Sequence, residues 1–211
     1  MATLNAGAPP AALAQRPVFV IFTGTGPASS GVTKVFAGRT DPLGSVIVPA
    51  SMLGSLPAGS YSVDAYFNGV PAPVNLASSD VDYAPAHGQA TLSLRWPFSG
   101  FLFPVKNPPT LNIATAGSAV PIRFALGGNR GLGILAAGSP VVTAVACPTG
   151  VATNTVQALI AIPVNFLVYV GAHVNQYLYA WKTSKSWAGT CRQFDLQLAD
   201  GSDHVATFRF Q

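Results

Sequence analysis

Asp80 and Asp82 are the two residues whose type and spacing come nearest to a metal site. In an extended segment, side chains two residues apart point to the same face, so these two carboxylates would lie together. Asp64 is a third oxygen donor if its strand lies beside them. Calcium takes roughly six to eight oxygen ligands, so the three aspartates would form a sparse site. A calcium site and a solvated loop are the alternatives, and we predict no metal-binding residues.

Residues for acid–base or nucleophilic catalysis are widely separated in the sequence. The three histidines, His87, His173 and His204, lie far from one another, and we expect each to be a surface or turn residue. No GxSxG, HExxH or P-loop pattern is present. The sequence also lacks glutamate, so a two-carboxylate glycosidase site would need two aspartates. We predict a non-enzymatic protein with no catalytic residues, no cofactor-binding residues and no cofactor.

Cys147 and Cys191 are the only cysteines, and they lack the CxxC spacing of a metal or thioredoxin-like site. Each lies in a segment of strand character, as the partners of a disulfide between two sheets would. A bridge between them closes a long loop and would stabilise the fold by roughly 3–4 kcal/mol. The alternative is a pair of buried thiols. We predict the disulfide, which implies an oxidising compartment.

Charged side chains are scarce. They make up 9% of the residues, against about 25% in an average soluble domain. Two explanations remain open: an extracellular or virion sandwich with a Ser/Thr/Asn/Gly surface, or a subunit that buries much of its surface against copies of itself. The lysines and arginines are scattered and form no run, so we predict no nucleic-acid binding.

The sequence predicts no membrane insertion, because no apolar run approaches the ~18 residues of a membrane-spanning helix. Residues 2–14 are rich in alanine and proline but lack the basic and apolar regions of a secretion signal. Either the chain is a mature fragment, or it leaves the cell by another route, as phage structural proteins do on lysis.

Short β-prone runs separated by glycine and proline account for most of the chain. An interruption from Trp96 to Gly100 divides them into two parts, residues 1–97 and 98–211. In the first part we predict strands near residues 17–23, 32–38, 45–49, 60–67 and 89–95. In the second part we predict strands near residues 110–114, 119–126, 141–147, 155–161, 165–170, 176–183, 191–199 and 204–210.

Three segments of the second part resemble, in the right order, the bacterial PxKF immunoglobulin-like domain. These segments are residues 100–110, 116–132 and 179–192. The middle one contains Pro121, Arg123 and Phe124 at the motif that gives the family its name, and the last contains Trp181 and Trp187. The resemblance covers residues 98–211. It implies an immunoglobulin-like sandwich of the kind found in secreted and cell-surface bacterial proteins, with no catalytic site.

The resemblance has three departures. Arg123 stands where the family name has lysine, which keeps the positive charge. Gly133 stands where an acidic residue is expected, and residues 150–176 match weakly. These positions leave the motif order intact.

The first part resembles the bacterial Ig-like repeats that often precede such a domain. Residues 56–67 are similar to the recurring strand–turn phrase of those repeats. Only residues 1–16 precede the first strong β run, so the repeat looks incomplete. An incomplete sandwich exposes a sheet edge, which is a template for a strand of another chain. Residues 1–16 are expected to lie extended against a neighbouring copy, and a free tail is the alternative.

The motif residues themselves have structural explanations. Pro121 cannot donate a hydrogen bond to a sheet, so it suits an edge strand or a bulge. Trp181 and Trp187 have the area to fill a sandwich core beside the disulfide, and an exposed platform for a ligand is the alternative.

The sequence therefore predicts an all-β chain of two immunoglobulin-like β-sandwich domains in tandem. The expected function is that of a non-enzymatic structural subunit of an extracellular, bacterial cell-surface or virion assembly, with copies of itself or an assembly protein as partner. The alternative is an adhesion or carbohydrate-binding module of a secreted bacterial protein, with a cell-surface glycan as ligand.

Overall fold

The computed structural model describes residues 2–3, 14–71, 75, 83–158, 165–171 and 174–211. The chain forms two compact units, Met1–Leu94 and Arg95–Gln211. The division falls between Leu94 and Arg95, whereas the sequence pattern placed it after Pro97.

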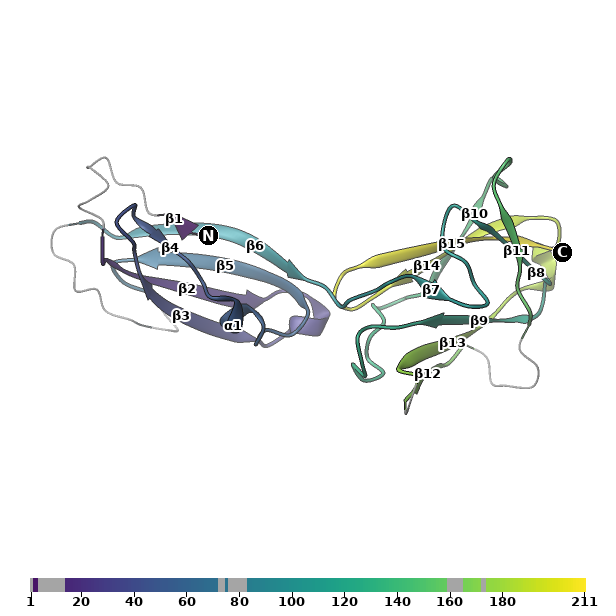
Figure 1. Cartoon of the computed structure of the whole chain (residues 1–211), viewed down its shortest axis with the longest axis horizontal. Coiled ribbons are helices and arrows are strands. Elements are labelled where there is room, and N and C mark those ends of the chain that lie inside the picture. The colour runs from purple at the N-terminus through teal and green to yellow at the C-terminus, as the bar shows by residue number, and fades with distance from the viewer. Residues whose placement is uncertain (1, 4–13, 72–74, 76–82, 159–164, 172–173) are drawn as a thin grey trace. The chain divides into compact units, whose positions relative to one another are not determined.

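The described chain is all-β (Figure 1). Its helical parts are the four-residue α1 (Ala50–Leu53) and the 3-10 turns η2 (Pro27–Ser29) and η3 (Lys185–Trp187). The strands of the first unit are β1 (Ala2–Thr3), β2 (Pro17–Gly24), β3 (Thr33–Arg39), β4 (Ser45–Val46), β5 (Gly59–Phe67) and β6 (Ala86–Leu94). The strands of the second unit are β7 (Phe101–Leu102), β8 (Leu111–Ala114), β9 (Ala119–Phe124), β10 (Val141–Val145), β11 (Thr153–Thr155), β12 (Leu167–Val170), β13 (Gln176–Lys182), β14 (Cys191–Gln197) and β15 (Asp203–Phe210). No helix of the described residues is long and apolar enough to cross a membrane.

The first unit is built on a four-stranded antiparallel sheet in the order β3-β2-β5-β6 (Figure 1). Val18, Val20 and Phe22 alternate along β2 with residues of the other face, and all three are buried. Tyr61 and Phe67 of β5 join them in the same core. Alternation thus places one face of the sheet, the inner face, in the core of the unit.

The layer that covers this inner face is small. It consists of a two-stranded ribbon of β1 and β4 and of the short helix α1. Val46, Met52 and Leu53 pack from this layer against the core of the sheet. No larger second sheet of described residues faces the four strands, so the part of the chain that the structure describes covers the inner face only in part.

The first residues of the chain pair within their own chain. Ala2 lies opposite Val46 and Thr3 opposite Ser45 in an antiparallel pair. Ala14 and Gln15 form a turn just before β2. Ala2 and Thr3 therefore have a partner strand in their own chain, and the expectation that residues 1–16 lie extended against a neighbouring copy stays a prediction. Residues 4–13 lie outside the described residues.

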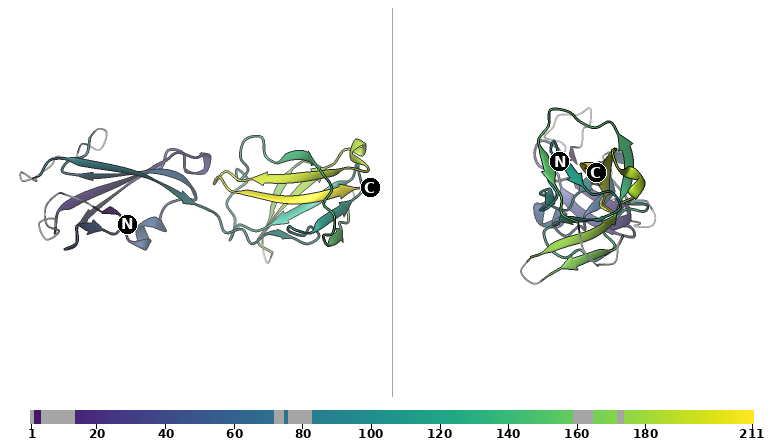
Figure 2. Two further views of the ribbon diagram at one scale, coloured as in Figure 1. Left: turned by 90° about the horizontal axis from the view of Figure 1, so that it is seen from above. Right: turned by 90° about the vertical axis from the view of Figure 1, so that its right-hand side faces the viewer.

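The second unit contains two sheets with a shared core (Figures 1 and 2). One has the order β10-β14-β15-β8-β11 and the other the order β12-β13-β9-β7. β8 runs parallel to both β15 and β11, and the remaining pairs are antiparallel. Inward-facing side chains of both sheets meet in one cluster, which is the arrangement of a β-sandwich. The largest fully buried members are Ile122, Phe124, Leu126, Ile134, Tyr177, Phe194, Leu196, Leu198, Phe208 and Phe210.

Candidate functional site

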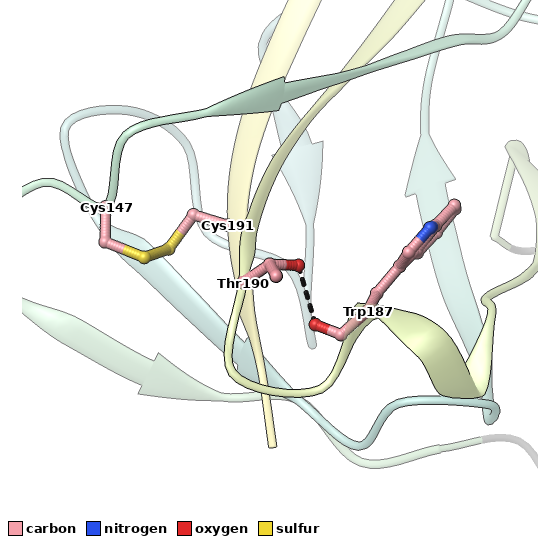
Figure 3. The surroundings of a disulfide bond; sticks show 4 residues. All are labelled: Cys147, Trp187, Thr190 and Cys191. Carbon is pink, nitrogen blue, oxygen red and sulfur yellow. Dashed lines mark hydrogen bonds between the residues drawn. A yellow bond between two sulfur atoms is a disulfide. The ribbon is translucent and has the colours of Figure 1, made fainter.

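Cys147 and Cys191 form a disulfide, with their Cα atoms 5.2 Å apart (Figure 3). Cys191 is the buried first residue of β14, and Cys147 lies two residues past the end of β10 and is exposed. β10 and β14 are neighbours in one sheet, with Val145 opposite Cys191. The predicted pairing is confirmed, but the predicted bridge between two sheets is wrong. The bond fastens the edge strand β10, which pairs with β14 alone, to its neighbour.

Trp187 ends the 3-10 turn η3, just before the disulfide. Ser184 caps this turn by accepting a hydrogen bond from the Ser186 amide at 3.2 Å. The Thr190 hydroxyl donates to the Trp187 carbonyl at 2.7 Å, which closes the following bend (Figure 3). The half-buried Trp187 ring points away from the disulfide, and the Arg192 guanidinium lies over it, 5.3 Å from its centroid. Trp187 therefore closes the side of the core and holds a cation at its rim.

Trp181 lies at the centre of the second unit's core, with 3% of its surface exposed. Its ring centroid lies 4.8 Å from that of Phe194, 5.2 Å from Phe208 and 5.8 Å from Phe210. These partners belong to the opposite sheet, so Trp181 joins the two layers. An exposed ligand platform is wrong for this residue.

Pro121 and Phe124 have structural positions in β9. Phe124 is fully buried and stacks on Tyr177 with ring centroids 5.4 Å apart. Pro121 lies opposite Ala180 of β13. On its other side β9 pairs with β7, but only at Arg123 and Phe124. Pro121 therefore lies where β9 has one neighbouring strand among the described residues, a position that tolerates the missing N–H.

Arg123 projects from the face of β9 opposite to Phe124, because neighbouring strand residues alternate. Its half-buried side chain lines a cavity of about 250 Å³. The other lining residues are Val170, Val174, Gln176, Tyr177 and Leu178. Val170 and Val174 are exposed, so apolar surface surrounds the cation at this place.

Tyr177 fixes the turn that follows β9. Its hydroxyl donates to the Gly131 carbonyl at 3.1 Å and accepts from the Arg130 amide at 2.5 Å. Burial raises the pKa of this hydroxyl, so it stays protonated and able to donate. Gly128 and Gly131 have positive φ angles of 123° and 80°, which other residues rarely adopt. Gly128 and Gly131 thus serve a turn that Tyr177 ties to the core.

Asp64 lies at the centre of a polar cluster on the outer face of the first unit's sheet. Its carboxylate accepts hydrogen bonds from Gln89 at 2.8 Å and Ser62 at 2.9 Å, and His87 Nε2 lies 3.0 Å from it. The His87 ring stacks on Tyr66 with centroids 4.3 Å apart. Burial by itself raises the pKa of Asp64, but these hydrogen bonds outweigh it and hold the pKa below its ordinary value.

The three histidines and the three aspartates that were considered as alternative calcium ligands lie in different surroundings. Asp80, Asp82 and His173 lie outside the described residues. Asp64 contacts the side chains of Ser62, His87 and Gln89. Within the described part of the chain, no group of three or more His, Cys, Asp or Glu residues could hold a metal ion. His87 is exposed, as expected, whereas His204 is half-buried.

A larger cavity, of about 410 Å³, lies in the first unit beside the inner face of β5 and β6. Val48, which lies between β4 and α1, and Leu53 of α1 line the cavity. The sheet side is formed by Val20, Phe22, Val63, Ala65, Gly88, Gln89, Ala90, Thr91 and Leu92. No histidine or aspartate of the described residues lines this cavity or the one at Arg123. The sequence pattern gave no signal for it, because it results from the partial cover of the sheet.

Asp200 is a buried carboxylate, 1% exposed, in the turn between β14 and β15. It accepts hydrogen bonds from the Ser202 amide at 3.0 Å and the Ser202 hydroxyl at 2.7 Å. The local bonds match the expectation for an aspartate in a hairpin turn. It also accepts from the Trp96 amide at 2.6 Å, a bond across 104 positions that the sequence did not indicate. The carboxylate therefore ties the beginning of the second unit to its final hairpin.

Replacement of Asp200 by alanine is expected to lower the unfolding free energy of the second unit by about 2–4 kcal/mol, because it leaves buried donors without an acceptor. Asp203→Ala in the same hairpin is the matched control. Its carboxylate is exposed, so we expect a change within about 0.5 kcal/mol. Urea unfolding followed by circular dichroism measures both variants. Equal stabilities for the two would contradict this role of Asp200.

His204 stacks on Phe98 with ring centroids 3.6 Å apart, and its Nε2 lies 3.1 Å from the Ser202 hydroxyl. Burial lowers the pKa of His204 below its ordinary value of 6.5, although the charges of Asp200, Asp203 and Asp195 act in the opposite direction. The unfolded chain therefore binds this proton at a higher pH than the folded chain does. The resulting stability is complete above pH 6.5 and is lost as the pH falls through the folded-state pKa.

We accordingly expect the unfolding free energy of the second unit to fall as the pH is lowered below 6.5. His204→Phe keeps a ring over Phe98 but cannot bind a proton, so the slope through this range should flatten. Urea unfolding at a series of pH values provides the measurement. A variant with the same slope as the unmodified chain would assign the pH dependence to other groups.

Comparisons of the chain with protein-family models, with curated proteins and with solved structures found no match.

Proposed function

We propose that this chain is a non-enzymatic structural subunit of an extracellular, cell-surface or virion assembly, and that it acts by protein–protein contact and self-association. The observation that carries the proposal is the first unit's partly covered sheet, with an apolar cavity of about 410 Å³ beside β5 and β6. An exposed apolar surface of this kind is typical of a site that another protein chain covers. The charge content of 9% adds to the argument, because little repulsion opposes association.

We further propose that the two units are immunoglobulin-like sandwiches in tandem, and that the second is of the PxKF type. The three motifs support this assignment, since their residues build β7, β9, β13, η3 and the start of β14. One feature differs from an antibody domain. The disulfide joins strands of one sheet rather than of two sheets.

The proposed location is outside the cytosol. A disulfide persists in oxidising surroundings, and the bond between Cys147 and Cys191 supports such a compartment. Secretion to a bacterial surface and release with a virion both satisfy this condition.

Sedimentation velocity of the purified chain, from low to high micromolar concentration, tests the proposed function. We expect a species heavier than the 21.7 kDa chain that grows with concentration. Because few charges take part, raising the salt concentration should leave this association in place. A chain that remains monomeric over the whole range would overturn the proposal.

The second candidate is an adhesion or carbohydrate-binding module, and the Asp64 cluster favours it. Tyr66 and His87 place stacked rings beside a carboxylate and an amide on one sheet face. Ring faces contact the CH groups of sugars, and such polar groups bind sugar hydroxyls. Binding to a glycan array that Tyr66→Ala abolishes would favour this candidate, and no binding by the unmodified chain would remove it.

A further inference from the structure

The two edges of the first unit's sheet differ in how they are protected. β3, at one edge, carries Lys34 and Arg39, charged residues of the kind that keep sheet edges from pairing with other chains. β6, at the other edge, has nine residues without lysine, arginine, aspartate, glutamate or proline. It pairs with β5 alone among the described strands. Its residues from Ala86 to Thr91 are exposed.

No other edge strand among the described strands is both as long as β6 and free of charged residues. The outermost strands of the second unit's sheets are β10, β11, β12 and β7, which have two to five residues each. Short edge strands offer few backbone groups to a partner. β10, the longest of them, is also fastened at one end by the disulfide. β6 is therefore the edge that is both long and uncharged.

The apolar cavity reaches the open edge of β6. Five consecutive residues, Gly88 to Leu92, line it. Gln89 and Thr91 lie on the outer face, since strand residues alternate, so they border the cavity through the backbone edge. A strand added along β6 would thus lie at the cavity mouth, with every second side chain on the cavity side.

We propose that β6 pairs antiparallel with β6 of a second copy of this chain, with Ala90 on the two-fold axis. The proposal rests on the self-association proposed above and assigns it to one interface. The four-stranded sheets of two copies become one continuous sheet across the axis. Backbone pairing then satisfies amides and carbonyls that otherwise need water.

The register follows from the side chains. With Ala90 on the axis, all nine residues pair, and each large inner-face residue meets a small one. Leu92 lies opposite Gly88 of the second copy, and Leu94 lies opposite Ala86. A Cβ atom added to Gly88 would meet no atom within 4 Å, so the space that Leu92 needs is open. On the outer face His87 meets Ser93 and Gln89 meets Thr91, so no like charges face each other.

Introducing charge at the axis tests the interface. Ala90→Lys places two ammonium groups opposite each other in the paired sheets, and we expect the dissociation constant to rise by about tenfold or more. Ala37→Lys is the matched control, an exposed alanine of the other edge strand, and should leave the dissociation constant unchanged. Equal effects of the two substitutions would overturn the β6 interface. Circular dichroism of both variants establishes that they are folded.

Cross-linking tests the register independently of affinity. Directly opposite residues of antiparallel strands have Cα atoms about 4.5–5.5 Å apart, within the range that a disulfide spans. Ala90→Cys should therefore form a covalent dimer on mild oxidation, and both native cysteines are already bonded to each other. In Ser93→Cys the two introduced residues lie about 20 Å apart, so no covalent dimer should form. A dimer from Ser93→Cys and none from Ala90→Cys would overturn the register.

The two proposals fail in different ways. A monomeric unmodified chain removes self-association altogether. An unmodified chain that associates, while Ala90→Lys weakens nothing and Ala90→Cys gives no covalent dimer, keeps self-association and overturns the β6 interface. If deletion of residues 2–13 then abolishes the association, the N-terminal segment of a second copy is the occupant instead.

Discussion

Replacing Trp181 by alanine is expected to lower the unfolding free energy of the Arg95–Gln211 unit by about 3–5 kcal/mol. The ring is 3% exposed and contacts aromatic side chains of the opposite sheet. Its removal takes away apolar burial and leaves a void between the two layers, which the rings of Phe194 and Phe208 fill only in part. A loss of this size is a large fraction of the stability of a typical domain.

Trp187→Ala is the control for this prediction, because Trp187 is half-buried at the rim of the same core. We expect Trp187→Ala to lower the unfolding free energy by much less than Trp181→Ala does. Urea unfolding followed by far-ultraviolet circular dichroism avoids a signal that depends on tryptophan itself. A denaturation midpoint that Trp181→Ala leaves unchanged would contradict the central position of this ring.

Removal of the disulfide is expected to have an effect of similar size. The double variant Cys147→Ser with Cys191→Ser should lose about 4 kcal/mol, because the bond closes a loop with a sequence separation of 44. The loss should be concentrated at β10, which pairs with β14 alone and whose end the bond fastens. Hydrogen exchange of Val141–Val145 should therefore accelerate more than that of β9.

Reduction of the unmodified chain with dithiothreitol serves as the parallel experiment. Alkylation followed by mass spectrometry should find no free thiol before reduction and two after it. Reduced and doubly substituted chains should then unfold at the same urea concentration. If both are as stable as the oxidised chain, loop closure by this bond contributes nothing to the fold.

Strand positions could be predicted from the sequence because alternation and turn residues act locally. The run from Tyr61 to Phe67 and the hairpin around Gly201 are both present as expected, in β5 and in β14–β15. Strands of two residues, such as β1 and β7, have no period to detect and were missed. β11 begins at Thr153, two residues before the predicted run at 155–161, because its position depends on pairing with β8 rather than on its own pattern.

The sequence-based predictions fail where they depend on which strands and turns become neighbours in the fold. Strand character suggested that Cys147 and Cys191 face each other from two sheets, but the pairing of β10 with β14 brings them together in one. The bond from Trp96 to Asp200 joins the start of the second unit to its end, and local sequence holds no signal for it. The cavity beside β6 has the same origin, since it depends on how much of the sheet β4 and α1 cover. The assignment to a PxKF-type domain stays a prediction.

Hydrogen exchange of the unmodified chain at low and at high concentration tests the central claim most directly. At high concentration the amides of Ala86–Leu94 should exchange more slowly, because pairing with a second copy protects them. The amides of Thr33–Arg39, at the charged edge of the same sheet, should exchange at the same rate at both concentrations. Exchange of Ala86–Leu94 that is independent of concentration would contradict association of two copies through this strand.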